Sequence, residues 1–221
     1  MVGDTVGYLT IKDEISSEFE EKKSIFIGHV KRVYNEEEAK AFINKIRSEH
    51  KEATHNVYAY IIGENMGIQR YSDDGEPQGT AGVPALDVIK KNGITNTVAV
   101  VTRYFGGVLL GKGGLVRAYS RGTAQAIKEA GIVERVQGAA LHVVIDYDLL
   151  GKVQYLCGQN LWHIEDIIYT DKVEIIVLCT DEIMEKIKNE MVQVTSGKCS
   201  FKKYEEGYYF KIENRLFKEE I

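Results

Sequence analysis

Glycine clustering is the feature that most constrains how this chain can fold. Ten of its 21 glycines lie between Gly75 and Gly122, most of them in two dense motifs that cover residues 73–82 and 103–114. Glycine is concentrated where the backbone needs a positive φ or where another group must approach it closely. Polar, glycine-rich loops between apolar elements are common places for binding or chemistry. We therefore predict that the functional site lies in this stretch.

Apolar periodicity predicts an α/β unit around the glycine-rich stretch. The predicted strands are residues 6–33, 57–62 and 97–102, and the predicted helices are residues 36–48, 84–92 and 113–130. Asn35 suits an N-cap, Pro84 suits a first helical turn and Gly131 suits a C-cap. Within the first strand region, the acids Glu18, Glu20 and Glu21 are expected to form a solvated connection. Residues 97–102 are apolar on both faces, which predicts a central strand.

Beyond Gln137-Gly138 the pattern changes to a compact alternation of short elements. Strands are predicted at residues 141–145, 162–169, 173–178 and 199–212, with helices at 149–157 and 183–194. This βαββαβ order is the split-βαβ, ferredoxin-like pattern. The sequence therefore predicts an α+β protein with one domain at residues 1–137 and a second at 138–221.

Composition narrows the classes of function. The net charge of −5 argues against polyanion binding over the whole surface, although a local basic patch can oppose the average. Three widely spaced cysteines predict neither disulfides nor a zinc site, and the start of the chain does not resemble a signal peptide. Since no apolar run is long enough for a membrane span, we expect a cytoplasmic protein without a metal, a cofactor or a membrane partner. The oligomeric state stays open.

One motif resembles a nucleotide-binding loop. The spacing Gly106-x-x-x-x-Gly111-Lys112 follows a predicted strand and opens a helix, as a Walker A loop does. The next residue is Gly113, so the hydroxyl that would bind Mg²⁺ is missing. A nucleotide hydrolase is therefore disfavoured. The alternative is a glycine turn that allows a helix to pack closely against its neighbouring strand.

An anion site without catalysis fits the same region better. From Gln78 to Lys128 there are seven bases and one acid, which gives a local charge of +6. Arg117 and Arg121 share one helix face because they are four residues apart. The residues predicted to bind nucleic acid or another anion are Arg103, Gly111, Gly113, Gly114, Arg117 and Arg121, with Tyr104, Phe105 and Tyr119 as nearby aromatic surface. The arginines could instead only solvate an outer helix face.

The acidic loop carries three carboxylates, on Asp73, Asp74 and Glu76. They could hold Mg²⁺ or act as an acid/base pair. We favour a structural or ion-pair role, since Gly75 and Pro77 are turn residues and basic side chains lie nearby. The remaining motif residues, to which we assign structural roles, are Gly79, Gly82, Gly106, Gly107 and a hydrogen-bonded His55.

With these residues in view, the chain resembles the YigZ/IMPACT family. The resemblance rests on Glu21-Lys22-Lys23-Ser24 with Phe26-Ile27, on Thr54-His55-Asn56-Val57-Tyr58-Ala59-Tyr60, on the motif from Asp73 to Gly82, and on Thr102 to Gly107 with Leu110-Gly111 and Gly113 to Tyr119. These long motifs span most of residues 15–131. The chain resembles the prokaryotic form, because no RWD-type domain precedes the motifs as it does in eukaryotic IMPACT proteins.

The resemblance implies a fold and a cellular role. It implies an N-terminal domain of the type of domain two of ribosomal protein S five, and a C-terminal domain similar to domain five of elongation factor G. Eukaryotic relatives regulate translation by binding a partner of the general-control eIF-two-alpha kinase. The leading hypothesis is therefore a non-enzymatic protein linked to translation, which binds RNA, the ribosome or an acidic protein partner. The alternatives are a metal-dependent enzyme acting on a small phosphate compound through residues 73–76, and a pure protein-interaction module.

Overall fold

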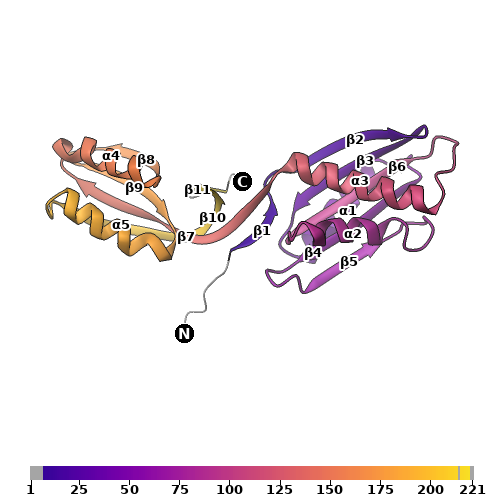
Figure 1. Ribbon diagram of the computed structural model, residues 1–221, viewed down its shortest axis with the longest axis horizontal. Coiled ribbons are helices and arrows are strands. Elements are labelled where there is room, and N and C mark those ends of the chain that lie inside the picture. Colours follow the sequence, from indigo (N-terminus) through magenta and orange to yellow (C-terminus); the bar gives the residue numbers. More distant parts are fainter. Residues whose placement is uncertain (1–6, 214, 220–221) are drawn as a thin grey trace. The chain divides into compact units, whose positions relative to one another are not determined.

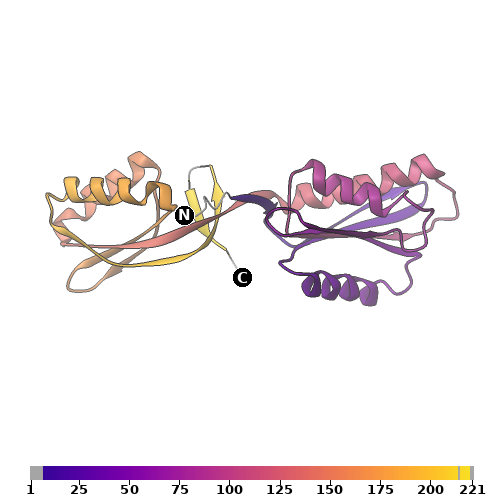
Figure 2. The ribbon, with the colours of Figure 1, turned by 90° about the horizontal axis from the view of Figure 1, so that it is seen from below.

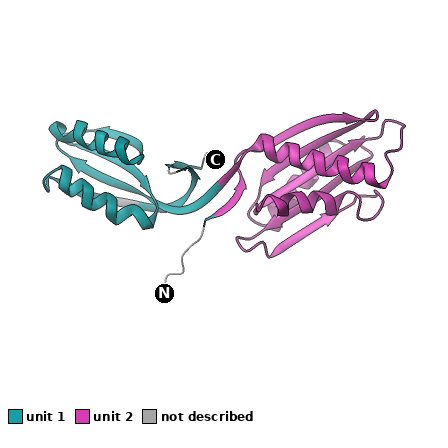
Figure 3. Ribbon diagram, in the orientation of Figure 1, with its two compact units in different colours: residues 1–7, 134–221 teal, residues 8–133 magenta. Residues whose placement is uncertain are grey.

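The computed structural model describes residues 7–213 and 215–219 and divides into two compact units (Figure 3). One unit holds residues 8–133, and the other holds residue 7 with the described residues from 134 onward. The residues at the start of the chain on which the signal-peptide expectation rests, and residue 6 of the first predicted strand, lie outside the described residues.

The unit of residues 8–133 is built on an antiparallel sheet with the strand order β2-β3-β6-β4-β5. The strands of this sheet are β2 (Ile15–Glu21), β3 (Ser24–Arg32), β4 (His55–Ile62), β5 (Ile68–Ser72) and β6 (Thr97–Tyr104), and strand β1 (Tyr8–Ile11) of the same unit lies outside it. Its helices are α1 (Glu36–Glu49), α2 (Gly82–Lys91) and α3 (Lys112–Ala130). Helices α2 and α3 cover one face of the sheet and α1 covers the other (Figures 1 and 2). Strand β6 is buried along almost its whole length, which confirms the predicted central strand.

Sequence signals explain where these helices begin and end. The Asn35 side chain accepts a hydrogen bond from the Glu38 amide at 2.8 Å, which confirms the predicted N-cap of α1. Gly131 follows α3 with φ of 73°, a left-handed conformation that favours glycine at a helix end. Helix α2 begins at Gly82, two residues before Pro84.

The other unit has the predicted βαββαβ order. Its elements are β7 (Ile132–Ile145), a short 3₁₀ helix η1 (Tyr147–Leu149), α4 (Leu150–Asn160), β8 (His163–Tyr169), β9 (Val173–Cys179), α5 (Asp181–Val194), β10 (Cys199–Ile212) and β11 (Arg215–Lys218). The sheet order is β11-β10-β7-β9-β8, and α4 and α5 pack on one face (Figure 2). Cys157 and Cys179 are buried in this core, and burial raises the pKa of both thiols to about 11.

Some elements differ from the sequence prediction. Glu18, Glu20 and Glu21 lie within β2, because Phe19 between them points into the core and fixes a strand. Strands β5 and β11 were not predicted, since both are short and half-exposed. Strand β7 runs without interruption through Gln137 and Gly138, where the boundary between the two domains was predicted. Among the described residues, no helix has the length and apolar character needed to cross a membrane.

Candidate functional site

The acidic loop between β5 and α2 is closed by hydrogen bonds to its own backbone. The Asp73 carboxylate accepts from the amides of Gly79 at 2.8 Å, Ala81 at 3.1 Å and Gly82 at 2.8 Å. These amides include the first ones of α2, which have no partner inside the helix. Asp73 is therefore the cap of α2, placed nine residues before the helix begins.

Asp74 forms hydrogen bonds that connect the acidic loop to helix α1 and strand β4. Its carboxylate accepts from an Arg47 Nη2 at 2.8 Å and from the Asn56 amide at 2.7 Å. Its carbonyl oxygen lies 2.7 Å from His55 Nδ1, which confirms the predicted hydrogen bond at His55. Asp74 has φ of 46° and the following Gly75 has φ of 91°, so the loop turns sharply at this pair.

Glu76 is buried in an ion pair with Arg103. Arg103 Nη1 donates to Glu76 Oε1 at 2.6 Å, and the Tyr119 hydroxyl donates to the same oxygen at 2.8 Å. The side chains of Glu76 and Arg103 are 4% and 6% exposed. Burial, together with the neighbouring Glu76 carboxylate, raises the pKa of the Tyr119 phenol. The three acids of this loop thus already have partners from the chain itself.

Arg103 was predicted to bind an anion at the surface, but its side chain is buried. Its guanidinium lies between the rings of Phe26 and Phe105, at 5.5 and 5.3 Å from their centroids. Its Nη2 reaches the buried Ser24 hydroxyl at 3.4 Å. A guanidinium enclosed in this way cannot contact a phosphate at the surface. The sequence could not show this, because an exposed and a buried arginine have the same neighbours along the chain.

A second polar cluster lies on the opposite face of the same sheet. His29 Nδ1 lies 2.7 Å from the Ser16 hydroxyl, and Nε2 lies 3.3 Å from the Thr102 hydroxyl. Burial lowers the pKa of His29 to about 4, with smaller contributions from His50 and Lys45. Tyr104, one of the predicted motif residues, contributes its hydroxyl to this region and lies 2.9 Å from His50 Nδ1.

The glycine turn between β6 and α3 is open, in contrast to the acidic loop. Gly106 lies directly against the turn between β2 and β3, where a Cβ would overlap the Lys23 carbonyl oxygen. Gly111 has φ of 70° and directly precedes the first helical residue, Lys112. Gly113 and Gly114 lie in the first turn of α3, whose initial amides have no hydrogen-bond partner within the helix. The turn between β2 and β3 therefore packs against Gly106, and its Lys22 lies near Gly114 in the first turn of α3.

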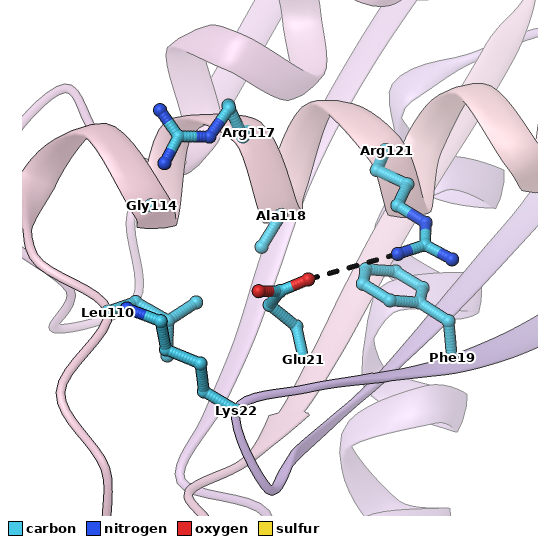
Figure 4. A pocket seen from close by; sticks show the side chains of 8 residues that line it. All are labelled: Phe19, Glu21, Lys22, Leu110, Gly114, Arg117, Ala118 and Arg121. Carbon is cyan, nitrogen blue, oxygen red and sulfur yellow. Dashed lines mark ion pairs between the residues drawn. The ribbon is translucent and has the colours of Figure 1, made fainter.

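A pocket of about 300 Å³ lies between α3 and the end of β2 with the turn that follows it. The residues lining it are Phe19, Glu21, Lys22, Leu110, Gly114, Arg117, Ala118 and Arg121 (Figure 4). The Glu21 carboxylate points to the Arg121 guanidinium, 3.9 Å away (Figure 4). Three cations and one anion give the lining a net charge of +2. The structure therefore brings the predicted Arg117 and Arg121 together at one concave surface.

Arg117 and Arg121 are both exposed, but they have different surroundings. Arg121 lies over the Phe19 ring, 4.2 Å from its centroid. An Nη1 of Arg117 lies 3.6 Å from the position that a Cβ would take at Gly113, so this guanidinium borders the first turn of α3. Anion binding needs such a positive side chain beside unpaired amides.

The sequence analysis missed the wall of the pocket that comes from β2 and the turn after it. Phe19 and Glu21 lie where the acids Glu18, Glu20 and Glu21 were expected to form a solvated connection, and Lys22 directly follows β2. The available signal was the alternation of Phe19 with the acids on either side, which is typical of a strand with one buried face.

The remaining predicted motif residues have structural positions. Pro77 and Gly79 lie in the acidic loop, where the Pro77 carbonyl accepts from the Thr80 amide and hydroxyl. The Phe105 amide donates to the Thr54 hydroxyl, and the Gly106 amide donates to the Ser24 hydroxyl. Gly107 has φ of 80°.

In the described part of the chain, no group of three or more His, Cys, Asp or Glu side chains could hold a metal ion.

Comparison with known proteins gives matches along both units. Residues 22–127 match the Impact N-terminal domain, and residues 143–198 match a domain of unknown function, DUF1949. The chain is 42% identical over 209 residues to IMPACT family member YvyE of Bacillus subtilis (strain 168), covering 95% of this chain and 96% of that protein. It is 39% identical over 153 residues to IMPACT family member YigZ of Escherichia coli (strain K12), covering 68% and 72% of the two chains.

A solved structure is similar over most of the chain. A crystal structure of a hypothetical protein is 31% identical, covers 89% of this chain and 96% of its own, and superposes with a TM-score of 0.58. Together with the two domain matches, this likeness gives the chain a two-domain architecture of mixed α/β content.

Proposed function

Because this chain belongs to the IMPACT family, we propose that it is a non-enzymatic binding protein that acts in translation or its regulation in the cytoplasm. The pocket beside α3 binds the phosphates of RNA, free or within the ribosome. Arg117 and Arg121 are the principal contacts, and Lys22 adds charge from the turn between β2 and β3.

The proposed domain relationships support this role by analogy of fold. We propose that residues 1–137 form a domain similar to domain two of ribosomal protein S five, and that residues 138–221 form one similar to domain five of elongation factor G. A pair of domains like those of a translocating factor suits contact with RNA or the ribosome. Since one fold serves many functions, the proposal depends on the site and not on the fold alone.

The observation that carries the proposal is that three cations line one pocket, which reaches the first turn of α3 at Gly114. Lys22, Arg117 and Arg121 come from two elements and line one pocket, next to the first turn of α3. Phosphate oxygens are bound in proteins by this combination of basic side chains and helix N-terminal amides. The net charge of −5 for the whole chain argues against such binding over the whole surface.

The geometry of the acidic loop favours this proposal over a phosphate-processing enzyme. The carboxylates of Asp73, Asp74 and Glu76 accept hydrogen bonds from backbone amides, Arg47, Arg103 and Tyr119. Neither these acids nor Arg103 line the pocket. An acid/base role would require a carboxylate that is free to exchange a proton with a substrate.

The proposal is tested by salt-dependent binding of a labelled single-stranded RNA of mixed sequence. Three phosphate contacts predict that log affinity falls with log salt at a slope of about −2. An Arg117→Glu/Arg121→Glu variant should lose most of this slope and most of its affinity. A Lys90→Glu/Lys91→Glu variant is the matched control, because it changes the net charge equally and these lysines do not line the pocket. Salt-insensitive binding, or full binding by the arginine variant, contradicts the proposal.

An acidic protein partner is the second candidate, and exposed apolar residues favour it. The exposed fractions of Phe105, Val108 and Leu109 are 45%, 39% and 82%, and these residues lie in the turn that leads to α3. Exposed apolar side chains with a basic border suit an acidic, amphipathic surface. A Leu109→Ser variant separates the two candidates, since it should weaken capture of a protein partner and leave RNA affinity unchanged.

A further inference from the structure

Arg121 packs over an aromatic ring that belongs to a stacked pair. The rings of Phe26 and Phe19 are stacked, with centroids 5.3 Å apart and planes 8° from parallel. The Arg121 guanidinium lies over the Phe19 ring, 4.2 Å from its centroid. Phe26 is fully buried and Phe19 is 8% exposed, so the core holds this stacked pair in place.

The Arg121 guanidinium has a second contact besides Phe19. The Glu21 carboxylate lies 3.9 Å from an Nη1 of Arg121, and the side chain of Arg121 is 55% exposed. One side of the guanidinium therefore contacts Phe19, while more than half of the side chain remains open to solvent. A long arginine side chain normally loses conformational freedom when it binds, and this contact with Phe19 removes part of that cost beforehand.

A guanidinium plane in this setting is suited to a flat ligand. Unpaired RNA bases are bound by stacking on aromatic side chains or on arginine guanidinium planes. Arg117 lies one helical turn toward the N-terminus, beside Gly113 and the first amides of α3, where a phosphate can bind. The pocket of about 300 Å³ between these arginines is at the lower end of the sizes used for small organic groups.

We propose that the Arg121 guanidinium is a stacking platform for one unpaired base of single-stranded RNA, whose adjacent phosphate binds Arg117 and the first turn of α3. This inference rests on the proposed function and assigns different roles to its two arginines. Arg117 binds the charged phosphate, and Arg121 stacks on the flat face of a base. The protein therefore prefers single-stranded RNA to a duplex, because the faces of paired bases are covered by their neighbours in the helix.

The test replaces the planar group and keeps the charge. Arg121→Lys should weaken binding of a labelled single-stranded RNA about tenfold, since stacking of one base on a side chain has an effect of this order. The same variant should bind the matching RNA duplex within about twofold of the unchanged protein, and its salt dependence should not change. Arg117→Lys is the matched control, and its preference for single-stranded RNA over duplex should be that of the unchanged protein.

An RNA of the same length with abasic positions completes the design, because it keeps the phosphates and removes the bases. The unchanged protein should bind it about as weakly as Arg121→Lys binds the normal strand, whereas Arg121→Lys should not distinguish the two strands. If Arg121→Lys binds single-stranded RNA like the unchanged protein, the stacking role is overturned while phosphate binding stands. If the unchanged protein binds neither RNA, the proposed function fails and the inference fails with it.

Discussion

The acidic loop at residues 73–82 and the glycine turn at residues 106–114 are alike in sequence and opposite in structure. Both are rich in glycine, carry charges and precede a helix. In the acidic loop each carboxylate is bound by backbone amides or basic side chains of the same chain. Directly after the glycine turn, Arg117 and Arg121 on α3 are exposed. A charged side chain that is buried with a partner from the chain itself stabilises the fold, whereas an exposed one remains accessible to a ligand.

The largest expected effect lies inside the acidic loop. Glu76→Ala leaves Arg103 buried without a counterion, so we expect a loss of roughly 3–5 kcal/mol in the free energy of unfolding. A Glu76→Met/Arg103→Met double variant should be much more stable than the single variant, since it removes both charges. Urea denaturation measures both. An equal loss in the two variants would show that the ion pair is not the source of the effect.

Protonation of His29 sharpens the comparison, because this group is also enclosed by the fold. Its pKa is about 4 in the folded chain and about 6.5 when unfolded, so between these values the unfolded chain binds the extra proton. Stability should therefore fall by roughly 3 kcal/mol as the pH drops from about 6.5 to about 4, and then level off. In His29→Gln this part of the pH dependence should be absent. Denaturation of both proteins across this pH range tests the expectation, and parallel curves would contradict it.

The cap of α2 gives a smaller expected effect. Asp73→Ala removes the acceptor for three backbone amides, and we expect a loss of about 1–2 kcal/mol, as for other helix caps. Asp87→Ala, at an exposed position on α2 itself, is the control and should change stability much less. RNA affinity should be the same in both variants. A loss of binding in Asp73→Ala without unfolding would mean that the acidic loop contributes to the ligand site.

The smallest expected effect on stability lies at the open turn. Arg117→Ala/Arg121→Ala should change the free energy of unfolding by no more than about 1 kcal/mol, because exposed charges contribute little to folding and the contact of Arg121 with Phe19 adds only a small amount. The same variant should lose most of its RNA affinity. Thermal unfolding and a binding titration on one sample measure the two quantities. A large destabilisation would place these arginines with the structural residues and end the contrast between the two motifs.

The sequence predicted the local structure well where the physical signal is local. The Asn35 cap, the Gly131 end of α3 and the βαββαβ order of the second unit depend on nearby residues and on apolar spacing. The sequence did not predict β5 and β11, because these short, half-exposed strands are defined by their partners in the sheet. Strand β7 continues through the predicted boundary at Gln137-Gly138 for the same reason, since pairing with β10 extends across the glycine.

For the candidate site, the sequence alone determined which residues could matter and the structure decided what each one does. The glycine clustering and the local charge of +6 can be found in the sequence alone, because both are properties of neighbouring residues. Whether Arg103 is buried against Glu76, and whether Arg121 lies over Phe19, depends on strands and helices that are far apart in the chain. Only the folded sheet brings β2, β6 and α3 together, so only the tertiary structure separates the buried Arg103 from the exposed Arg117 and Arg121.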